Sequence, residues 1–89
     1  MNDYAALRQY IIDWLDDNYH FGDAEALIQS DEMSFMDHAI LDSLGFVQLI
    51  LFLEQTFDMA IDRKDLSRDN FDGMAKIISY VSSHQAAKG

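Results

Sequence analysis

The chain has 89 residues, 49% of them apolar, which suits one domain with a single core and leaves no room for a second. Sixteen Asp and Glu residues against six Lys and Arg residues give a net charge of −10. Nucleic acid, which needs a basic surface, is therefore excluded as a ligand, and basic protein surfaces are favoured as partners. The chain has no cysteine, so any thioester that it carries needs a sulfur from elsewhere. No segment resembles a leader or approaches the roughly 18 apolar residues of a membrane span, which predicts a cytoplasmic location.

The first third of the chain predicts one helix and a long connection. Helical spacing relates Tyr4, Leu7, Ile11, Trp14 and Leu15, which predicts an amphipathic helix over about 3–19 with Asn2 or Asp3 as its cap. Residues 20–42 are long for a connection, but their apolar side chains predict that the segment packs onto the protein. A short helical turn after Asp23 is compatible with this segment.

The rest of the chain predicts three further helices. Residues 43–57 are strongly apolar and predict a central helix that Asp42 or Ser43 caps. The acidic segment that follows suits a loop with Ile61 and Leu66 as apolar anchors and a short third helix over about 63–68. A helical stripe then predicts a last helix over about 71–83. With no alternating segment that indicates a strand, we expect an all-α four-helix bundle with a long first loop, in one domain spanning 1–89.

Ser43 is the most informative residue because it opens the most apolar helix. A helix N-terminus offers unpaired N–H groups and the positive end of a dipole, so an anionic group attached to Ser43 would be favoured there. Asp42 beside it is able to cap the helix or to engage a modifying enzyme.

The predicted central helix has two apolar faces. At about 100° per residue, Val47, Leu51 and Glu54 fall within roughly 80° of Ser43. A different side carries the core residues, which we expect to be Leu49, Leu53 and Phe57. An exposed apolar patch with a polar rim marks a partner site, so Leu44, Val47 and Leu51 are candidate partner contacts. The alternative is that Val47 and Leu51 are buried against the long loop.

Asp42-Ser43-Leu44, followed by an amphipathic helix that ends Glu-x-x-Phe-Asp, resembles the acyl carrier protein family, including its peptidyl and D-alanyl carrier branches. The resemblance runs from Ser34 to about Gln85. SFMDHAILDSLGFVQLILFLEQTFDMAI is similar to the family's approach loop, attachment motif and recognition helix, and FDGMAKIISYV is similar to its final helix.

The resemblance implies that Ser43 is the attachment serine. A phosphopantetheinyl transferase would use magnesium and coenzyme A to add a 4′-phosphopantetheine arm, whose thiol then carries acyl or aminoacyl groups as thioesters. A loading ligase and downstream acyl-processing enzymes would be the other partners, in lipid or secondary-metabolite biosynthesis, and the monomeric carrier itself would perform no catalysis. Phe35 matches a buried loop anchor, and the implied partner contacts are Asp42, Leu44, Val47, Leu51, Glu54 and Ile61.

Several positions depart from the fatty-acid carriers and leave the branch open. Ile40 and Leu41 stand where those carriers have a Gly-Ala pair, and Gly45 and Gln48 stand where acids are common. Leu41 and Gly45 look more like D-alanyl or aminoacyl carriers. Bulky rings at Phe46, Phe52 and Phe57 favour a short cargo.

Rival hypotheses come from other classes of protein. The first is an acidic helical interaction module that is never modified, and the second is a small hydrolase that uses Ser43 with His38, although no nucleophile-elbow pattern surrounds Ser43. His20, His38 and His84 lack the spacing of metal ligands, so no metal site is predicted. The acidic segment around Gly73 does not fit a calcium-binding loop, because Arg68 and Ser79 would occupy its first and last ligand positions.

Overall fold

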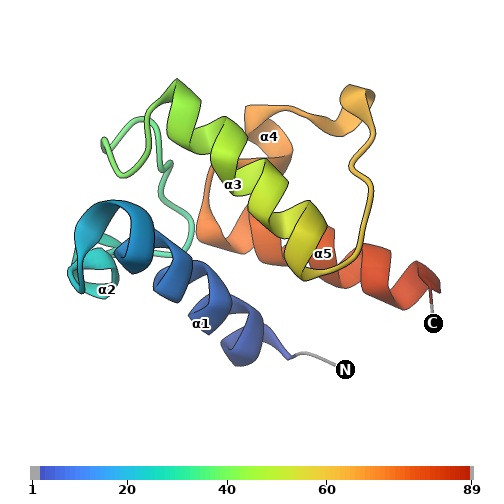
Figure 1. Ribbon diagram of the computed structural model, residues 1–89, viewed down its shortest axis with the longest axis horizontal. Coiled ribbons are helices and arrows are strands. Elements are labelled where there is room, and N and C mark those ends of the chain that lie inside the picture. Colours follow the sequence, from blue (N-terminus) through green and yellow to red (C-terminus); the bar gives the residue numbers. More distant parts are fainter. Residues whose placement is uncertain (1–2, 89) are drawn as a thin grey trace.

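The computed structural model describes residues 3–88, and every regular element in that range is helical. The predicted all-α class is confirmed, but the chain is divided more finely than into four helices (Figure 1). The α-helices are α1 (Tyr4–Leu15), α2 (Ala24–Leu27), α3 (Ser43–Thr56), α4 (Arg68–Phe71) and α5 (Met74–Lys88), with a π-helical turn η1 (Asp16–His20) and a 3-10 turn η2 (Arg63–Asp65).

Helix α1 begins where the sequence predicts. The Asp3 carboxylate accepts a hydrogen bond from the Ala6 N–H at 2.8 Å, which satisfies one of the free donors of the first turn. Asn2, the alternative cap, lies outside the described residues. The helix widens into η1, and the chain leaves it at Phe21 in the left-handed conformation (φ 52°).

The long first connection is packed down, as its apolar content predicts. It contains the short helix α2, and the side chains of Ala24, Ile28 and Phe35 are buried. A polar cluster also holds it against α1: the Arg8 guanidinium contacts Asp31 at 3.0 Å and Glu25 at 2.7 Å. These contacts fix the path of the chain toward the start of α3.

Helix α3 crosses in front of α5 in Figure 1, and buried side chains of both helices belong to one core cluster. The packing against α1 is aromatic. The rings of Trp14 and Phe52 stack at 5.4 Å between centroids, and Tyr10 meets Phe57 edge-on at 5.7 Å. The most apolar helix therefore packs against both α1 and α5.

The third and last helices differ from their predicted ranges. The segment predicted as one helix over 63–68 is split into η2 and α4, because the backbone at Ser67 is extended (φ −145°, ψ 160°). Phe71, predicted to open the last helix, instead ends α4. Gly73 then adopts a φ of 154°, a conformation that side-chain-bearing residues rarely adopt, and α5 starts at Met74.

Candidate functional site

Ser43 is the first residue of α3 and is exposed to solvent. Asp42 is the cap: its backbone is extended, and its carboxylate accepts a hydrogen bond from the Gly45 N–H at 2.8 Å. Because Asp42 performs the capping, the Ser43 hydroxyl is not needed for it. The site therefore presents an exposed hydroxyl at the positive end of a 14-residue helix.

The backbone just before Ser43 is folded around Phe35. The Phe35 ring is fully buried, and its carbonyl accepts hydrogen bonds from the N–H groups of Ile40 and Leu41 at 2.8 and 3.2 Å. Phe35 therefore has the buried position expected of a loop anchor. Ile40 and Leu41, which distinguish the chain from fatty-acid carriers, are themselves buried, so their bulk fills the core under the start of α3.

Asp72 is a positioning residue that sequence reasoning missed. Its side chain is buried, and its carboxylate accepts hydrogen bonds from the Ser34 hydroxyl, the Met36 N–H at 3.0 Å and the Arg68 guanidinium at 2.7–2.9 Å. Burial opposes its ionisation, but the hydrogen bonds from Ser34, Met36 and Arg68 outweigh burial and hold the pKa of Asp72 below its ordinary value. Asp72 thus ties the loop that leads to Ser43 to the junction of α4 and α5.

Gly45 allows η1 to approach the first turn of α3 closely. A Cβ atom on Gly45 would lie 3.0 Å from Leu41 Cδ2 and 3.3 Å from both the Asp42 carboxylate and the Tyr19 hydroxyl. One turn further along, the Tyr19 hydroxyl donates a hydrogen bond to the Gln48 side-chain carbonyl. Gly45 and Gln48 stand where fatty-acid carriers commonly have acids, and both are positions at which η1 meets α3. This contact gives the absence of acidic residues a structural reason.

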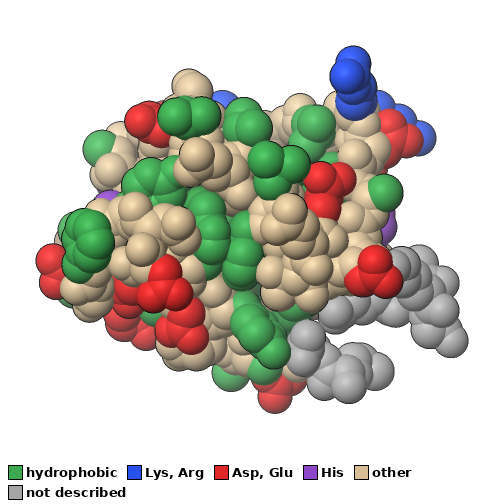
Figure 2. Space-filling view, in the orientation of Figure 1, with side chains coloured by type: hydrophobic (Ala, Val, Ile, Leu, Met, Phe, Trp, Pro, Cys, Tyr) green, Lys and Arg blue, Asp and Glu red, His purple; other side chains and the backbone are tan. Residues whose placement is uncertain are grey.

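The two faces of α3 are arranged as the sequence predicts, except that Phe57, predicted as a core residue, follows the end of the helix and is half-buried. Leu49 and Leu53 are fully buried, whereas Leu44, Val47 and Leu51 are 66%, 54% and 50% exposed. The alternative in which Val47 and Leu51 are buried against the long loop is therefore wrong. In Figure 2, hydrophobic side chains follow the course of α3, while acidic side chains gather over the region of α2.

Ile61 and Glu54 differ from the other candidate partner contacts. Ile61 is only 9% exposed and belongs to the core, as expected of an apolar anchor, which leaves little of its side chain for a partner to contact. The Glu54 carboxylate accepts a hydrogen bond from the Ile61 N–H at 2.9 Å and is half-buried. Glu54 therefore holds the connection after α3, and the exposed apolar face consists of Leu44, Val47 and Leu51.

This exposed face continues toward α1 across a shallow groove. The groove has a volume of about 340 Å³ and its lining is uncharged, made of Trp14, Asn18, Gln48, Leu51, Phe52 and Gln55. Helical spacing predicted that Trp14 belongs to the apolar stripe of α1. It did not predict that the Trp14 ring lies beside the exposed face of α3.

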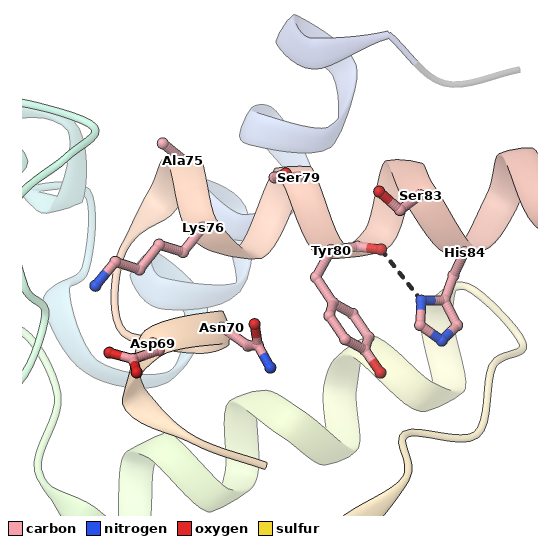
Figure 3. Close-up of a pocket in the computed structure, with 8 residues that line it drawn as sticks. All are labelled: Asp69, Asn70, Ala75, Lys76, Ser79, Tyr80, Ser83 and His84. Carbon is pink, nitrogen blue, oxygen red and sulfur yellow. Dashed lines mark hydrogen bonds between the residues drawn. The ribbon is translucent and has the colours of Figure 1, made fainter. Parts of the chain in front are cut away.

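No histidine is hydrogen-bonded to Ser43 in the described part of the chain, and a hollow beside α5 lies apart from the site. His38 Nδ1 lies 3.0 Å from the Ser34 carbonyl, and within residues 3–88 no hydrogen bond joins a histidine to Ser43. No three side chains of the metal-binding types cluster in that range either. Another hollow, of about 460 Å³, lies between α4 and α5 and does not include Ser43 in its lining (Figure 3); it is lined by Asp69, Asn70, Ala75, Lys76, Ser79, Tyr80, Ser83 and His84.

None of the helices in the described part of the chain has the length and apolar character needed to cross a bilayer. A small all-helical chain with an exposed serine at the start of its most apolar helix, beside an apolar face, has the features of the carrier-protein class that its sequence resembles. The chain is similar to D-alanyl carrier proteins of Streptococcus pyogenes, among them those of serotype M1, serotype M5 (strain Manfredo) and serotype M49 (strain NZ131).

Each of these relatives is 39% identical over 51 residues, which cover 57% of this chain. The chain spans 65% of the length of each relative that it matches. No protein-family model and no solved structure matches the chain. The comparison confirms the resemblance to carrier proteins and supports its D-alanyl branch.

Proposed function

We propose that this chain is a carrier protein of the aminoacyl type, with one carrier domain over 1–89, which holds its cargo as a thioester on a 4′-phosphopantetheine arm attached to Ser43. The observation that carries the proposal is the exposed Ser43 hydroxyl at the first position of α3, left free because Asp42 caps the helix. The similarity to D-alanyl carrier proteins favours an aminoacyl cargo over a fatty acyl one.

The residues around Ser43 fit a phosphodiester. The first N–H groups of a helix lack partners within the helix, and the dipole of α3 is positive at this end, so a phosphate on Ser43 Oγ is stabilised there. When bound, the arm supplies the thiol that this cysteine-free chain lacks. Asp42 and Asp72 contribute by holding the loop and helix start in place, and the chain is a substrate of its partners rather than a catalyst.

The exposed face of α3 suits partners that dock through apolar contacts. Leu44, Val47 and Leu51 protrude beside Ser43, and Glu54 is the one acidic residue within α3. A transferase, a loading ligase and the enzymes that consume the cargo would each cover this face in turn. Docking of a short polar cargo needs no large interior pocket, which agrees with the way that Phe46, Phe52 and Phe57 pack against the core. We further propose that the chain acts as a monomer in the cytoplasm.

Intact-mass measurement tests the proposal. Incubation with coenzyme A, magnesium and a broad-specificity transferase should add the mass of one phosphopantetheine to the wild-type chain and none to Ser43→Ala. Ser67→Ala is the matched control, because the Ser67 side chain makes no capping hydrogen bond to α4, and it should be modified like the wild type.

Two outcomes would contradict the proposal. Absence of any mass gain, under conditions that modify a control carrier, would favour an unmodified acidic interaction module. Hydrolysis of simple esters that depends on Ser43, without modification, would favour a hydrolase.

A further inference from the structure

A further hollow reaches Asp42, the residue before the attachment serine, and is unused by the function proposed above. It has a volume of about 340 Å³ and lies between η1 and the loop before α3, lined by Tyr19, His20, Met36, Ala39, Ile40, Leu41 and Asp42. The His20 ring connects η1 with this loop, because its Nε2 lies 2.8 Å from the Ile40 carbonyl. The hollow is therefore a feature of the folded loop and of η1 together.

The hollow is within reach of any group attached to Ser43. Asp42, the residue before Ser43, both caps α3 and lines the hollow. Consecutive Cα atoms are about 3.8 Å apart, so the backbone of Ser43 adjoins a residue of the lining, and a flexible chain on its Oγ is long enough to reach the hollow. The branched, dimethyl-bearing carbon of phosphopantetheine follows its phosphate by only a few bonds, so this part of the arm meets the hollow first.

The lining fits that part of the arm chemically. Ile40 and Leu41 are buried and Met36 is half-buried, which gives an apolar floor. The Tyr19 hydroxyl and the His20 ring are the polar groups at its side, and His20 Nε2 faces the Ile40 carbonyl, which acts as an acceptor.

The charge of the lining favours a neutral segment of the arm in the hollow over the phosphate. The Asp42 carboxylate is the charged group of the lining, and neither lysine nor arginine lines the hollow. Without a basic partner a phosphate is disfavoured inside, whereas the free N–H groups of the first turn stabilise it at the start of α3. A neutral segment with two methyl groups, a hydroxyl and an amide is favoured inside.

We propose that this hollow seats the first, branched segment of the phosphopantetheine arm, with its methyl groups against Met36, Ile40 and Leu41 and its hydroxyl or first amide toward Tyr19 and His20. The inference rests on the proposed function, because it requires the arm on Ser43. It places the arm on the side of η1, so that Val47 and Leu51 stay uncovered for a partner. The thiol half of the arm, with its cargo, remains outside the hollow.

Nuclear Overhauser effects in the arm-bearing protein test the seat. With an arm labelled with 13C at its two methyl groups, we expect cross-peaks from these methyls to the methyl groups of Met36, Ile40 and Leu41. Cross-peaks to Leu44, Val47 or Leu51 instead would overturn the inference, and so would an arm that gives sharp signals and no cross-peaks to the protein.

A pair of methionine variants gives a matched control. Met36→Ala removes part of the floor and should weaken the remaining cross-peaks to Ile40 and Leu41, while Met33→Ala changes a half-buried methionine outside the hollow and should leave them unchanged. Equal loss in both variants would contradict a seat at Met36, and if a variant does not fold, the wild-type cross-peaks still decide. Intact mass is measured first: failure to attach the arm contradicts the proposed function, whereas an attached arm without cross-peaks contradicts the seat alone.

Discussion

Replacement of Asp72 by alanine removes the acceptor that ties the loop before Ser43 to the end of α4. The carboxylate is 2% exposed and accepts hydrogen bonds from the Ser34 hydroxyl and the Met36 N–H as well as from Arg68. A hydrogen bond to a charged group contributes roughly 1.5–3 kcal/mol, so the loss of those from Ser34 and Met36 should lower the free energy of unfolding by about 3 kcal/mol. This is a large share of the roughly 5–15 kcal/mol typical of a folded domain.

Urea unfolding followed by circular dichroism measures this loss. Asp37→Ala is the control, because Asp37 binds the same guanidinium, Arg68, through a side chain that is 67% exposed. An exposed ion pair contributes little, so Asp37→Ala should stay close to the wild type. An Asp72→Ala variant as stable as Asp37→Ala would refute the argument that the buried carboxylate holds the loop.

The pH dependence of the same comparison follows from the pKa of Asp72. Because hydrogen bonds hold this pKa below the ordinary value of 3.8 in the folded state, the contribution of Asp72 is fully present above that value. It is lost as the pH falls through the folded pKa. The difference in unfolding free energy between wild type and Asp72→Ala should therefore be constant above about pH 5 and narrow below about pH 4. A difference that grows in acid would contradict this assignment.

Three further predictions concern the backbone, the exposed face and the charge. Gly73→Ala should lower the free energy of unfolding more than Gly22→Ala. Both glycines have a positive φ, but a Cβ on Gly73 would lie 3.0 Å from a backbone carbonyl oxygen, whereas Gly22 faces open space. Equal losses of stability in the two variants would contradict this clash. The variants Val47→Asp and Leu51→Asp should fold normally, yet partner enzymes should modify or load them more slowly. The variant Leu49→Asp should not fold, because Leu49 is fully buried. Unchanged rates of modification and loading in the first two variants would argue against docking on this face. Added salt should raise the melting temperature because the net charge is −10, and a melting temperature indifferent to salt would show that self-repulsion is unimportant.

Local patterns predicted the elements that depend on near neighbours. The stripe of α1, the cap at Asp42 and the division of α3 into a core face and an exposed face follow from helical spacing and from the preference of aspartate for caps. Leu49 is buried and Val47 is exposed for that reason. The exposure of Ser43 follows from its place at the helix start.

Contacts between distant segments were not predictable in the same way. Asp72 and Ser34 are 38 residues apart, so no local pattern shows that a carboxylate after α4 anchors the loop before α3. Ile61 was predicted both as an apolar anchor and as a partner contact, but no local pattern showed that its N–H donates to Glu54 while its side chain is buried in the core. Tyr19 likewise meets Gln48 only because η1 lies against α3.

The central claim is that Ser43 carries the arm, and peptide mapping of the modified protein tests it most directly. Cleavage after glutamate releases residues 33–54, a peptide that contains Ser34 and Ser43 as its serines. Fragmentation of this peptide should place the mass of one phosphopantetheine on Ser43. An unmodified peptide, or an arm located on Ser34, would contradict the account.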